Sequence, residues 1–164
     1  MADVMHIETE RKFLVKDLTF KDSAVSSSRI AQGYVAHDGG NTVRVRIRDS
    51  RGILTIKGPS TNGMSRLEWE KDIPLQDAED LLPLCHGGII DKTRYIVPCG
   101  KRFFEVDVFH GDNEGLVMAE IELGSEDEAF EKPAWLGEEV TGDKRYYNSY
   151  LTLRPYKTWQ EAIS

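Results

Sequence analysis

Charged side chains recur at every second residue through most of the strand-like segments of this sequence. Arginines at positions 44, 46 and 48 alternate with valine and isoleucine, and Glu120 and Glu122 alternate with Ile121 and Leu123. Residues two apart point to the same face of a strand, so each segment has one charged and one apolar face. This period predicts eight strands, at about 6–15, 30–36, 41–50, 52–57, 65–73, 92–97, 102–109 and 116–123.

The signs of these charges are sorted by segment. Acidic residues dominate the predicted strands 6–15, 102–109 and 116–123, whereas basic residues dominate 41–50 and 92–97. On a single strand, a charged face is most simply the solvent side of an antiparallel sheet. Three arginines at period two repel one another on such a face, and groups of opposite charge lying between the strands would relieve that repulsion. We therefore expect a closed eight-stranded antiparallel β-barrel whose charged faces point into the lumen.

The barrel prediction also says what must lie inside and outside it. A dry lumen with so many charges would be unstable, so we expect it to contain water, metal ions and a polyanionic ligand. The apolar outer faces need cover, and we expect helices packed outside the barrel at 19–29, 74–83, 125–131 and in one or two segments of 143–163. The length of 164 residues favours one α+β domain over 1–164.

Composition excludes several classes of function. The net charge is −7, from 28 acidic and 21 basic side chains, which argues against a nucleic-acid partner. No stretch approaches 18 apolar residues, and the first residues lack a signal peptide, so we expect no membrane partner and a cytoplasmic location. Cys85 and Cys99 are expected to be free thiols, and the four histidines lack zinc-site spacing. A homodimer is compatible with the sequence, which does not fix the oligomeric state.

The two kinds of charged wall suggest phosphate chemistry. Guanidinium and ammonium groups suit phosphate oxygens. Carboxylates would meet phosphate through a hard divalent cation, and Mg²⁺ or Mn²⁺ takes protein carboxylates, waters and substrate phosphates as ligands. Such a site fits transfer of a phosphoryl group to water. The sequence has no Walker A pattern, no glycine-rich dinucleotide loop and no Gly-x-Ser-x-Gly elbow.

A series of motifs adds a family resemblance. The sequence contains, in order, Glu8-Thr9-Glu10-Arg11-Lys12, Gln32-Gly33-Tyr34, Val43-Arg44-Val45-Arg46, Thr55-Ile56-Lys57-Gly58, Arg66-Leu67-Glu68-Trp69-Glu70, Asp91-Lys92-Thr93-Arg94-Tyr95, Phe104-Glu105-Val106-Asp107-Val108-Phe109, Ala119-Glu120-Ile121-Glu122-Leu123 and Trp135-Leu136-Gly137-Glu138-Glu139-Val140-Thr141. Together these motifs resemble the CYTH superfamily, the triphosphate tunnel metalloenzymes. The chain looks like its short bacterial members, several of which act as tripolyphosphatases.

The resemblance implies roles for individual residues. It implies that Glu8, Glu10 and Glu122 are ligands of the catalytic metal, with Glu120 close by. The matching phosphate-binding bases are Lys12, Arg44, Arg46, Lys57, Lys92 and Arg94. The acids Glu68, Glu70 and Asp107 match residues that support a second metal or orient the attacking water. Tyr34 and Lys92 match a pair that affects which phosphate is attacked.

The leading hypothesis is metal-dependent hydrolysis of inorganic tripolyphosphate or a similar linear triphosphate by water. Alternatives on the same scaffold are a thiamine triphosphatase, a nucleoside triphosphatase and a class IV adenylate cyclase. The absence of an aromatic cluster suited to a base favours the inorganic substrate. An alternative of another class is a polyphosphate-binding module without turnover. We also expect Arg48 and Asp72 to face solvent, Trp69 and Trp135 to pack in the outer core, and Lys144 and Arg145 to lie in a segment covering one tunnel mouth.

Overall fold

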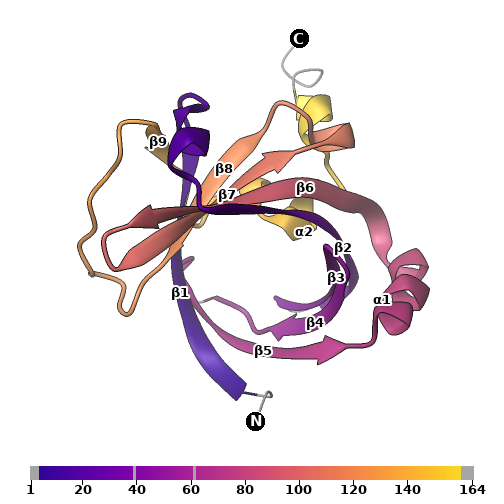
Figure 1. Ribbon diagram of the computed structural model, residues 1–164. Coiled ribbons are helices and arrows are strands. Elements are labelled where there is room, and N and C mark those ends of the chain that lie inside the picture. Colours follow the sequence, from indigo (N-terminus) through magenta and orange to yellow (C-terminus); the bar gives the residue numbers. More distant parts are fainter. Residues whose placement is uncertain (1–3, 39, 61, 160–164) are drawn as a thin grey trace.

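The strands form one closed antiparallel sheet in the computed structural model, which describes residues 4–38, 40–60 and 62–159 (Figure 1). The strands are β1 (Val4–Val15), β2 (Ser26–Asp38), β3 (Asn41–Arg48), β4 (Arg51–Lys57), β5 (Ser65–Ile73), β6 (His86–Cys99), β7 (Arg102–Phe109), β8 (Val117–Glu122) and β9 (Leu136–Glu139). Their order is β5-β4-β3-β2-β6-β7-β8-β1-β9, and a further β5–β1 pairing closes the ring. The predicted eight-stranded antiparallel barrel is confirmed, with β9 added outside the closure.

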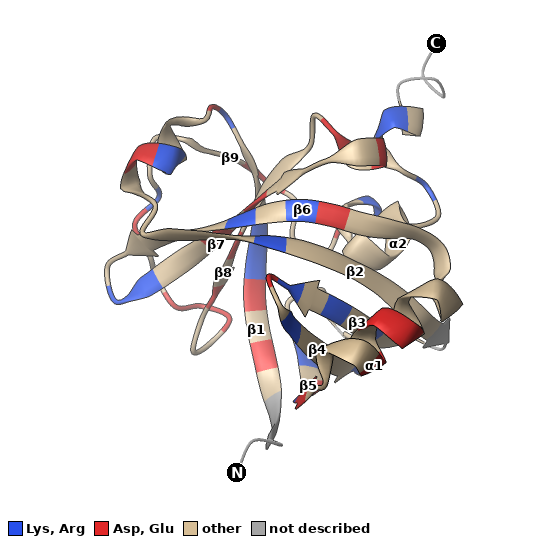
Figure 2. Ribbon diagram, turned by 45° about the vertical axis from the view of Figure 1, so that its right-hand side comes forward, with Lys and Arg blue, Asp and Glu red and all other residues tan. Residues whose placement is uncertain are grey.

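Strand β1 closes the barrel because its two halves pair with different neighbours. Residues 4–9 pair with β5, and residues 10–14 pair with β8. Glu8 is therefore in register with Arg66, whereas Glu10 is in register with Glu122. Figure 2 shows charged positions repeating along β1 and β3, as the period of two predicts.

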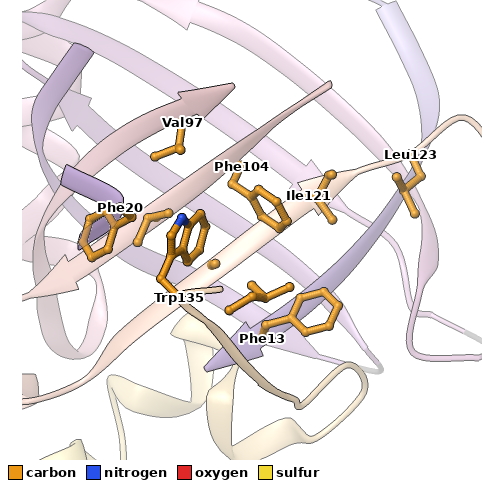
Figure 3. Packing of buried hydrophobic residues seen from close by; sticks show 10 residues of the cluster. Phe13, Phe20, Val97, Phe104, Ile121, Leu123 and Trp135 are labelled. Atoms are coloured by element: carbon orange, nitrogen blue, oxygen red, sulfur yellow. The ribbon is translucent and has the colours of Figure 1, made fainter. Parts of the chain in front are cut away.

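The main apolar core lies on the outer side of the barrel wall. It joins Phe13 of β1, Phe104 of β7 and Ile121 of β8 to Phe20 and Trp135 from the flanking segments (Figure 3). The Phe104 and Trp135 rings meet edge to face at 5.2 Å, a favoured aromatic geometry. Burying one such aromatic side chain stabilises the fold by about 1.5–3 kcal/mol. Trp135 packs as the sequence predicts, and the charged side chains remain for the inner face.

A second apolar cluster fixes the C-terminal segment. Ile90, Phe109, Leu116 and Met118 of the barrel pack around Leu151 of α2 (Asn148–Leu151). The short turns η4 (Lys144–Tyr146) and η5 (Tyr156–Thr158) flank α2, and their tyrosine rings contact Trp159 edge to face. This anchoring holds residues 147–149 against the lumen.

The helical predictions are confirmed in part. The predicted helical region 143–163 contains the short turns η4 and η5 and the helix α2. Only residues 19–23 of the predicted helix 19–29 form a helical turn, η1 (Thr19–Ser23), because Ser26 onward alternates inward and outward and joins β2. No helix forms at 125–131, where Glu128 instead caps the Gly124 backbone N–H and pairs with Arg102. The predicted helix 74–83 corresponds to α1 (Leu75–Leu81) and η2 (Leu82–Leu84), and α1 packs outside against β3 and β4.

Two strand features escaped the sequence prediction. β9 was absent from it, and β6 begins at His86 rather than at residue 92. The missed start contains Gly87 at φ +73°, where a Cβ would lie 2.6 Å from the Thr152 carbonyl oxygen. Glycine there marks a close approach to the C-terminal segment, not a loop. The predicted domain also includes 1–3 and 160–164, which lie outside the described residues.

Two smaller expectations concern the thiols and the membrane. Cys85 and Cys99 are both free, as predicted. Within the described residues, no helix is long and apolar enough to span a bilayer.

Candidate active site

The barrel encloses a polar cavity of about 220 Å³. Its lining comes from β1, β2, β3, β4, β5, β6, β7, β8 and α2, so residues from the whole chain converge there. The predicted site residues that line it are Glu8, Glu10, Lys12, Tyr34, Arg44, Arg46, Lys57, Glu68, Glu70, Lys92, Arg94, Glu120 and Glu122. Of the predicted site residues, only Asp107 does not line the cavity.

A basic wall is formed by β3 and β6, which lie on either side of β2. Arg46 is in register with Gln32 of β2, and Lys92 is in register with Ile30. Both basic side chains are buried. Burial, with neighbouring arginines, lowers the pKa of Arg46 to about 9. Burial lowers the pKa of Lys92 to about 7, although Asp107 opposes this change. Burial therefore disfavours the charged form of both groups, and an incoming anion would stabilise it.

Asp107 supports this wall from behind. Its carboxylate accepts two hydrogen bonds from Arg94, at 2.8 and 2.9 Å, and lies 2.8 Å from Lys92 Nζ. Burial disfavours the charged carboxylate, but Arg94 and Lys92 outweigh burial and lower the pKa of Asp107 to about 2. The resemblance implied a metal or water role for Asp107, whereas in the structure Asp107 does not line the cavity and pairs with Lys92 and Arg94.

Arg44 offers an unused hydrogen-bond donor. Its terminal nitrogen donates to Thr55 at 3.0 Å and lies 3.6 Å from Glu70. Its Nε is buried and has no hydrogen-bond partner. A buried guanidinium N–H without an acceptor is costly, and a phosphate oxygen in the cavity would satisfy it.

An acidic wall is formed by β1, β5 and β8. Burial, followed by the charges of Glu120 and Glu8, raises the pKa of Glu10 well above its usual value. Glu10 and Glu120 are linked by a hydrogen bond, and the pKa of Glu120 is lowered, since Lys12 and this bond outweigh burial. The two pKa values therefore move in opposite directions within one hydrogen-bonded carboxyl pair.

A second carboxyl pair repeats this pattern. Glu8 and Glu68 share a hydrogen bond, and Lys57 Nζ lies 2.8 Å from Glu8 and 3.5 Å from Glu68. Burial tends to raise the pKa of Glu8, but Lys57 outweighs it and lowers that pKa. Burial and Glu8 raise the pKa of Glu68. Lys57 and Lys12 therefore stand among the acids rather than on the basic wall.

The carboxylates fit a hard divalent cation. In the part of the chain that the structure describes, no three acidic, histidine or cysteine side chains are close enough to surround one ion. Mg²⁺ and Mn²⁺ do not need such a cage, since they bind through one or two carboxylates plus waters and phosphates. A cation would also relieve the repulsion within each crowded carboxyl pair. Glu122, in register with Glu10, is exposed at the rim of this group.

Several lining residues were missed or misplaced by the sequence analysis. Arg48 was expected to face solvent, but it lines the cavity and donates to Ser28 at 2.9 Å. It continues the period of Arg44 and Arg46, which was the available signal. Asp72 is exposed as predicted. Further lining residues that were not assigned to the site are Gln32, Thr42, Ile53, Thr55, Arg66, Glu105, Tyr147, Asn148 and Ser149.

The segment that approaches the lumen from the C-terminal side is not the predicted pair. Lys144 and Arg145 do not line the cavity, and Arg145 pairs with Asp143 at the surface. Tyr147 instead lies over Lys12 and Arg66, with 5.1 and 5.7 Å between cation and ring centre. Tyr147 lies in a segment that has no periodic sequence pattern, so its approach to the lumen could not be predicted from the sequence.

Comparison with known proteins agrees with this geometry. Residues 6–149 match the CYTH domain family. The chain belongs to the CYTH family. An inorganic triphosphatase of Acetivibrio thermocellus is 47% identical over 155 residues, covering 94% of this chain and 98% of that protein. One from Nitrosomonas europaea is 41% identical over 151 residues, covering 89% and 97%.

Solved structures also match the fold of this chain. The crystal structure of an inorganic triphosphatase matches with a TM-score of 0.65 and 36% identity, over 89% of this chain and 94% of that one. A protein from Pyrococcus horikoshii matches with a TM-score of 0.59 over 73% of this chain and 81% of its own. At 17% identity, the second match shows the fold alone.

Proposed function

We propose that this CYTH protein is an inorganic triphosphatase, which hydrolyses tripolyphosphate with Mg²⁺ or Mn²⁺. The carrying observation is one cavity within the barrel in which a basic wall with an unused donor faces an acidic wall of crowded carboxyls. The names of relatives at 47% and 41% identity support the same activity. The cavity also has few apolar side chains in its lining, with little to hold a nucleobase or thiazole ring.

We assign substrate binding to the basic groups of the lumen. Arg44, Arg46 and Arg94 present planar donors suited to phosphate oxygens, and Lys92 adds a point charge. Lys12 and Lys57 stand at the boundary with the acidic wall. These groups neutralise charge on the leaving phosphates, which is the main requirement of phosphoryl transfer.

We assign the metal to Glu8, Glu10, Glu120 and Glu122. A bound divalent cation supplies charge neutralisation and activation of water there. The role of the protein is to hold carboxylate oxygens on one face of β1 and β8, opposite the phosphate-binding bases. Glu68 and Glu70 lie beside this group on β5 and would orient the attacking water, while Tyr34 and Lys92 would position the phosphate that is attacked.

The reaction itself is a simple hydrolysis. The water oxygen forms a bond to a terminal phosphorus, and the bond from that phosphorus to the bridging oxygen breaks. The products are orthophosphate and pyrophosphate, and the water proton passes to solvent or to a lumen carboxylate. Asp107 takes no part in bond making and holds Lys92 and Arg94 in place.

The test is phosphate release from tripolyphosphate, ATP and thiamine triphosphate in parallel, each with Mg²⁺, Mn²⁺ or EDTA. We expect fast, metal-dependent release from tripolyphosphate and little from the organic substrates. Faster release from ATP or thiamine triphosphate would replace the substrate assignment. Binding of tripolyphosphate without release from any substrate would favour a binding module, and cyclic AMP formation from ATP would favour a cyclase.

A further inference from the structure

A fully buried glutamine connects two separate parts of the basic wall. Gln32 lies on β2, between β3 and β6, and its exposed fraction is 0%. Its Oε1 accepts from Arg46 Nε at 2.8 Å. Its Nε2 donates to Asn148 Oδ1 at 3.2 Å and to the Tyr34 hydroxyl at 3.3 Å. Asn148 Oδ1 also accepts from Lys92 Nζ at 2.8 Å.

The direction of each hydrogen bond in this network is fixed by the two cations at its ends. Arg46 and Lys92 are donors only, so each must meet a carbonyl oxygen. Gln32 therefore turns its oxygen to Arg46, and its NH₂ group faces Asn148. Asn148 turns its oxygen to both Gln32 and Lys92. Tyr34 receives a hydrogen bond from Gln32, which leaves its own O–H proton available to a ligand.

The two amides are neutral, and this matters for binding an anion. Asp107 pairs its carboxylate with Arg94 and with Lys92, which cancels part of their positive charge. A carboxylate at position 32 would do the same to Arg46. The amide bridge instead gives Arg46 and Lys92 neutral hydrogen-bond acceptors, so it adds no negative charge beside either cation. The bridge also connects β2 and β6 to α2, because Asn148 belongs to α2 in the C-terminal segment.

We propose that Gln32 is a positioning residue for triphosphate, which acts with Asn148 to hold Arg46 and Lys92 at a fixed spacing without adding a negative charge beside them. This inference rests on the proposed function, because it concerns the same cavity. A ligand that spans both cations binds more tightly because their spacing is fixed. A shorter ligand, such as pyrophosphate, gains less affinity from that spacing.

The first test compares Gln32→Met with Gln76→Met, a matched change at an exposed glutamine of α1. For Gln32→Met we expect KM for tripolyphosphate to rise about 10- to 100-fold, the range for one hydrogen bond to a charged group. We expect kcat to change less than KM, since Arg46 grips the substrate before and during reaction. Gln76→Met should match the wild type. An unchanged KM in folded Gln32→Met would overturn the proposal.

The second test uses Gln32→Glu, which keeps the shape of the side chain and the acceptor for Arg46. If Gln32 only fills space and satisfies Arg46, this variant should bind tripolyphosphate like the wild type. The proposal expects weaker binding, since the carboxylate neutralises Arg46 and repels Asn148 Oδ1. Titration calorimetry of tripolyphosphate and pyrophosphate in EDTA measures this without turnover, and the loss should be larger for tripolyphosphate. Equal losses for both ligands would contradict the fixed-spacing role.

A double-mutant cycle isolates the bridge. Gln32→Met and Asn148→Leu should each weaken tripolyphosphate binding, and the double variant should lose less than the product of the two effects. Additive effects would show that the two amides act separately, against the proposal. Failure of the proposed function is distinguishable, because the wild type would then bind tripolyphosphate in EDTA yet release no phosphate with any metal.

Discussion

The two walls of the lumen solve the problem of buried charge in different ways. Side chains on the basic wall are partly paired: Arg94 and Lys92 share Asp107, and Arg46 has the amide of Gln32. On the acidic wall, carboxyl groups are hydrogen-bonded to each other, Glu10 to Glu120 and Glu8 to Glu68, and the pKa of one member of each pair is raised. The basic side chains are thus held in place by protein partners, whereas the acidic wall gathers carboxyl groups that a cation would stabilise. This difference matches the proposed roles, in which the basic wall binds the substrate and the acidic wall binds the metal.

The largest expected effect is on turnover when the acidic wall loses a ligand. Glu10→Gln should lower the rate of tripolyphosphate hydrolysis by at least about 1000-fold, since metal activation is worth several kcal/mol. Its thermal stability in EDTA should be equal to or above that of the wild type, because a crowded carboxyl is removed. Glu114→Gln, at an exposed turn, is the control and should retain activity. Full activity in purified Glu10→Gln would remove the metal assignment.

Loss of the carboxylate that supports the basic wall should mainly lower folding stability. Asp107→Asn leaves Arg94 and Lys92 without their shared carboxylate, and we expect a loss of about 3–5 kcal/mol in the free energy of unfolding. Asp72→Asn breaks the exposed pair with Arg51 and should cost less than about 1 kcal/mol. Urea unfolding followed by circular dichroism measures both. Similar losses in the two variants would mean that Asp107 does not stabilise the wall.

A smaller effect should separate binding from turnover. Arg46→Ala should weaken tripolyphosphate binding about 10- to 100-fold, since a charge-assisted contact is lost. The loss should be the same in EDTA and with Mg²⁺, because Arg46 belongs to the wall that needs no metal. Arg51→Ala, on the outer surface, is the matched control. If Arg46→Ala bound normally in EDTA, the division into two independent walls would be wrong.

The smallest expected effect is the uptake of a fraction of a proton by Lys92 when tripolyphosphate binds. With a pKa of about 7, Lys92 is mostly neutral at pH 8 in the free protein. A polyanion favours the ammonium form and raises that pKa, so tripolyphosphate binding at pH 8 should take up protons, and at pH 6 it should take up almost none from this group. Calorimetry in EDTA, in two buffers with different ionisation enthalpies, measures the uptake. Lys92→Met should reduce it, and an uptake unchanged by that variant would assign the proton to another group.

How much the sequence predicts depends on whether a period is present. Charge alternation on β3, β5 and β8 is enough to place Arg44, Glu68 and Glu120 in one lumen, since neighbouring strands force alternate side chains inward. Arg48 follows the same period, but it is the last residue of β3, where a side chain is often exposed to solvent. Asp107 shows a second limit of the sequence prediction. Alternation predicts which face of β7 carries Asp107, but its position behind Lys92 depends on three-dimensional packing.

Segments without a period were predicted poorly. Acidic residues after Ser125 suggested a helix start, yet Glu128 is used by Arg102 and by the Gly124 N–H. Asn148 enters the lumen only because Leu151 and Trp159 anchor the C-terminal segment outside it. Such placements depend on contacts between residues far apart in the chain, and no local pattern carries them.

The most direct test of the two-wall account is a crystal structure with Mn²⁺ and tripolyphosphate. Anomalous scattering locates the manganese, and the phosphates are located by their density. We predict manganese beside Glu10 and Glu120, with the phosphates against Arg44, Arg46 and Arg94. Manganese bound away from β1 and β8, or phosphates placed without contact to these arginines, would contradict the account.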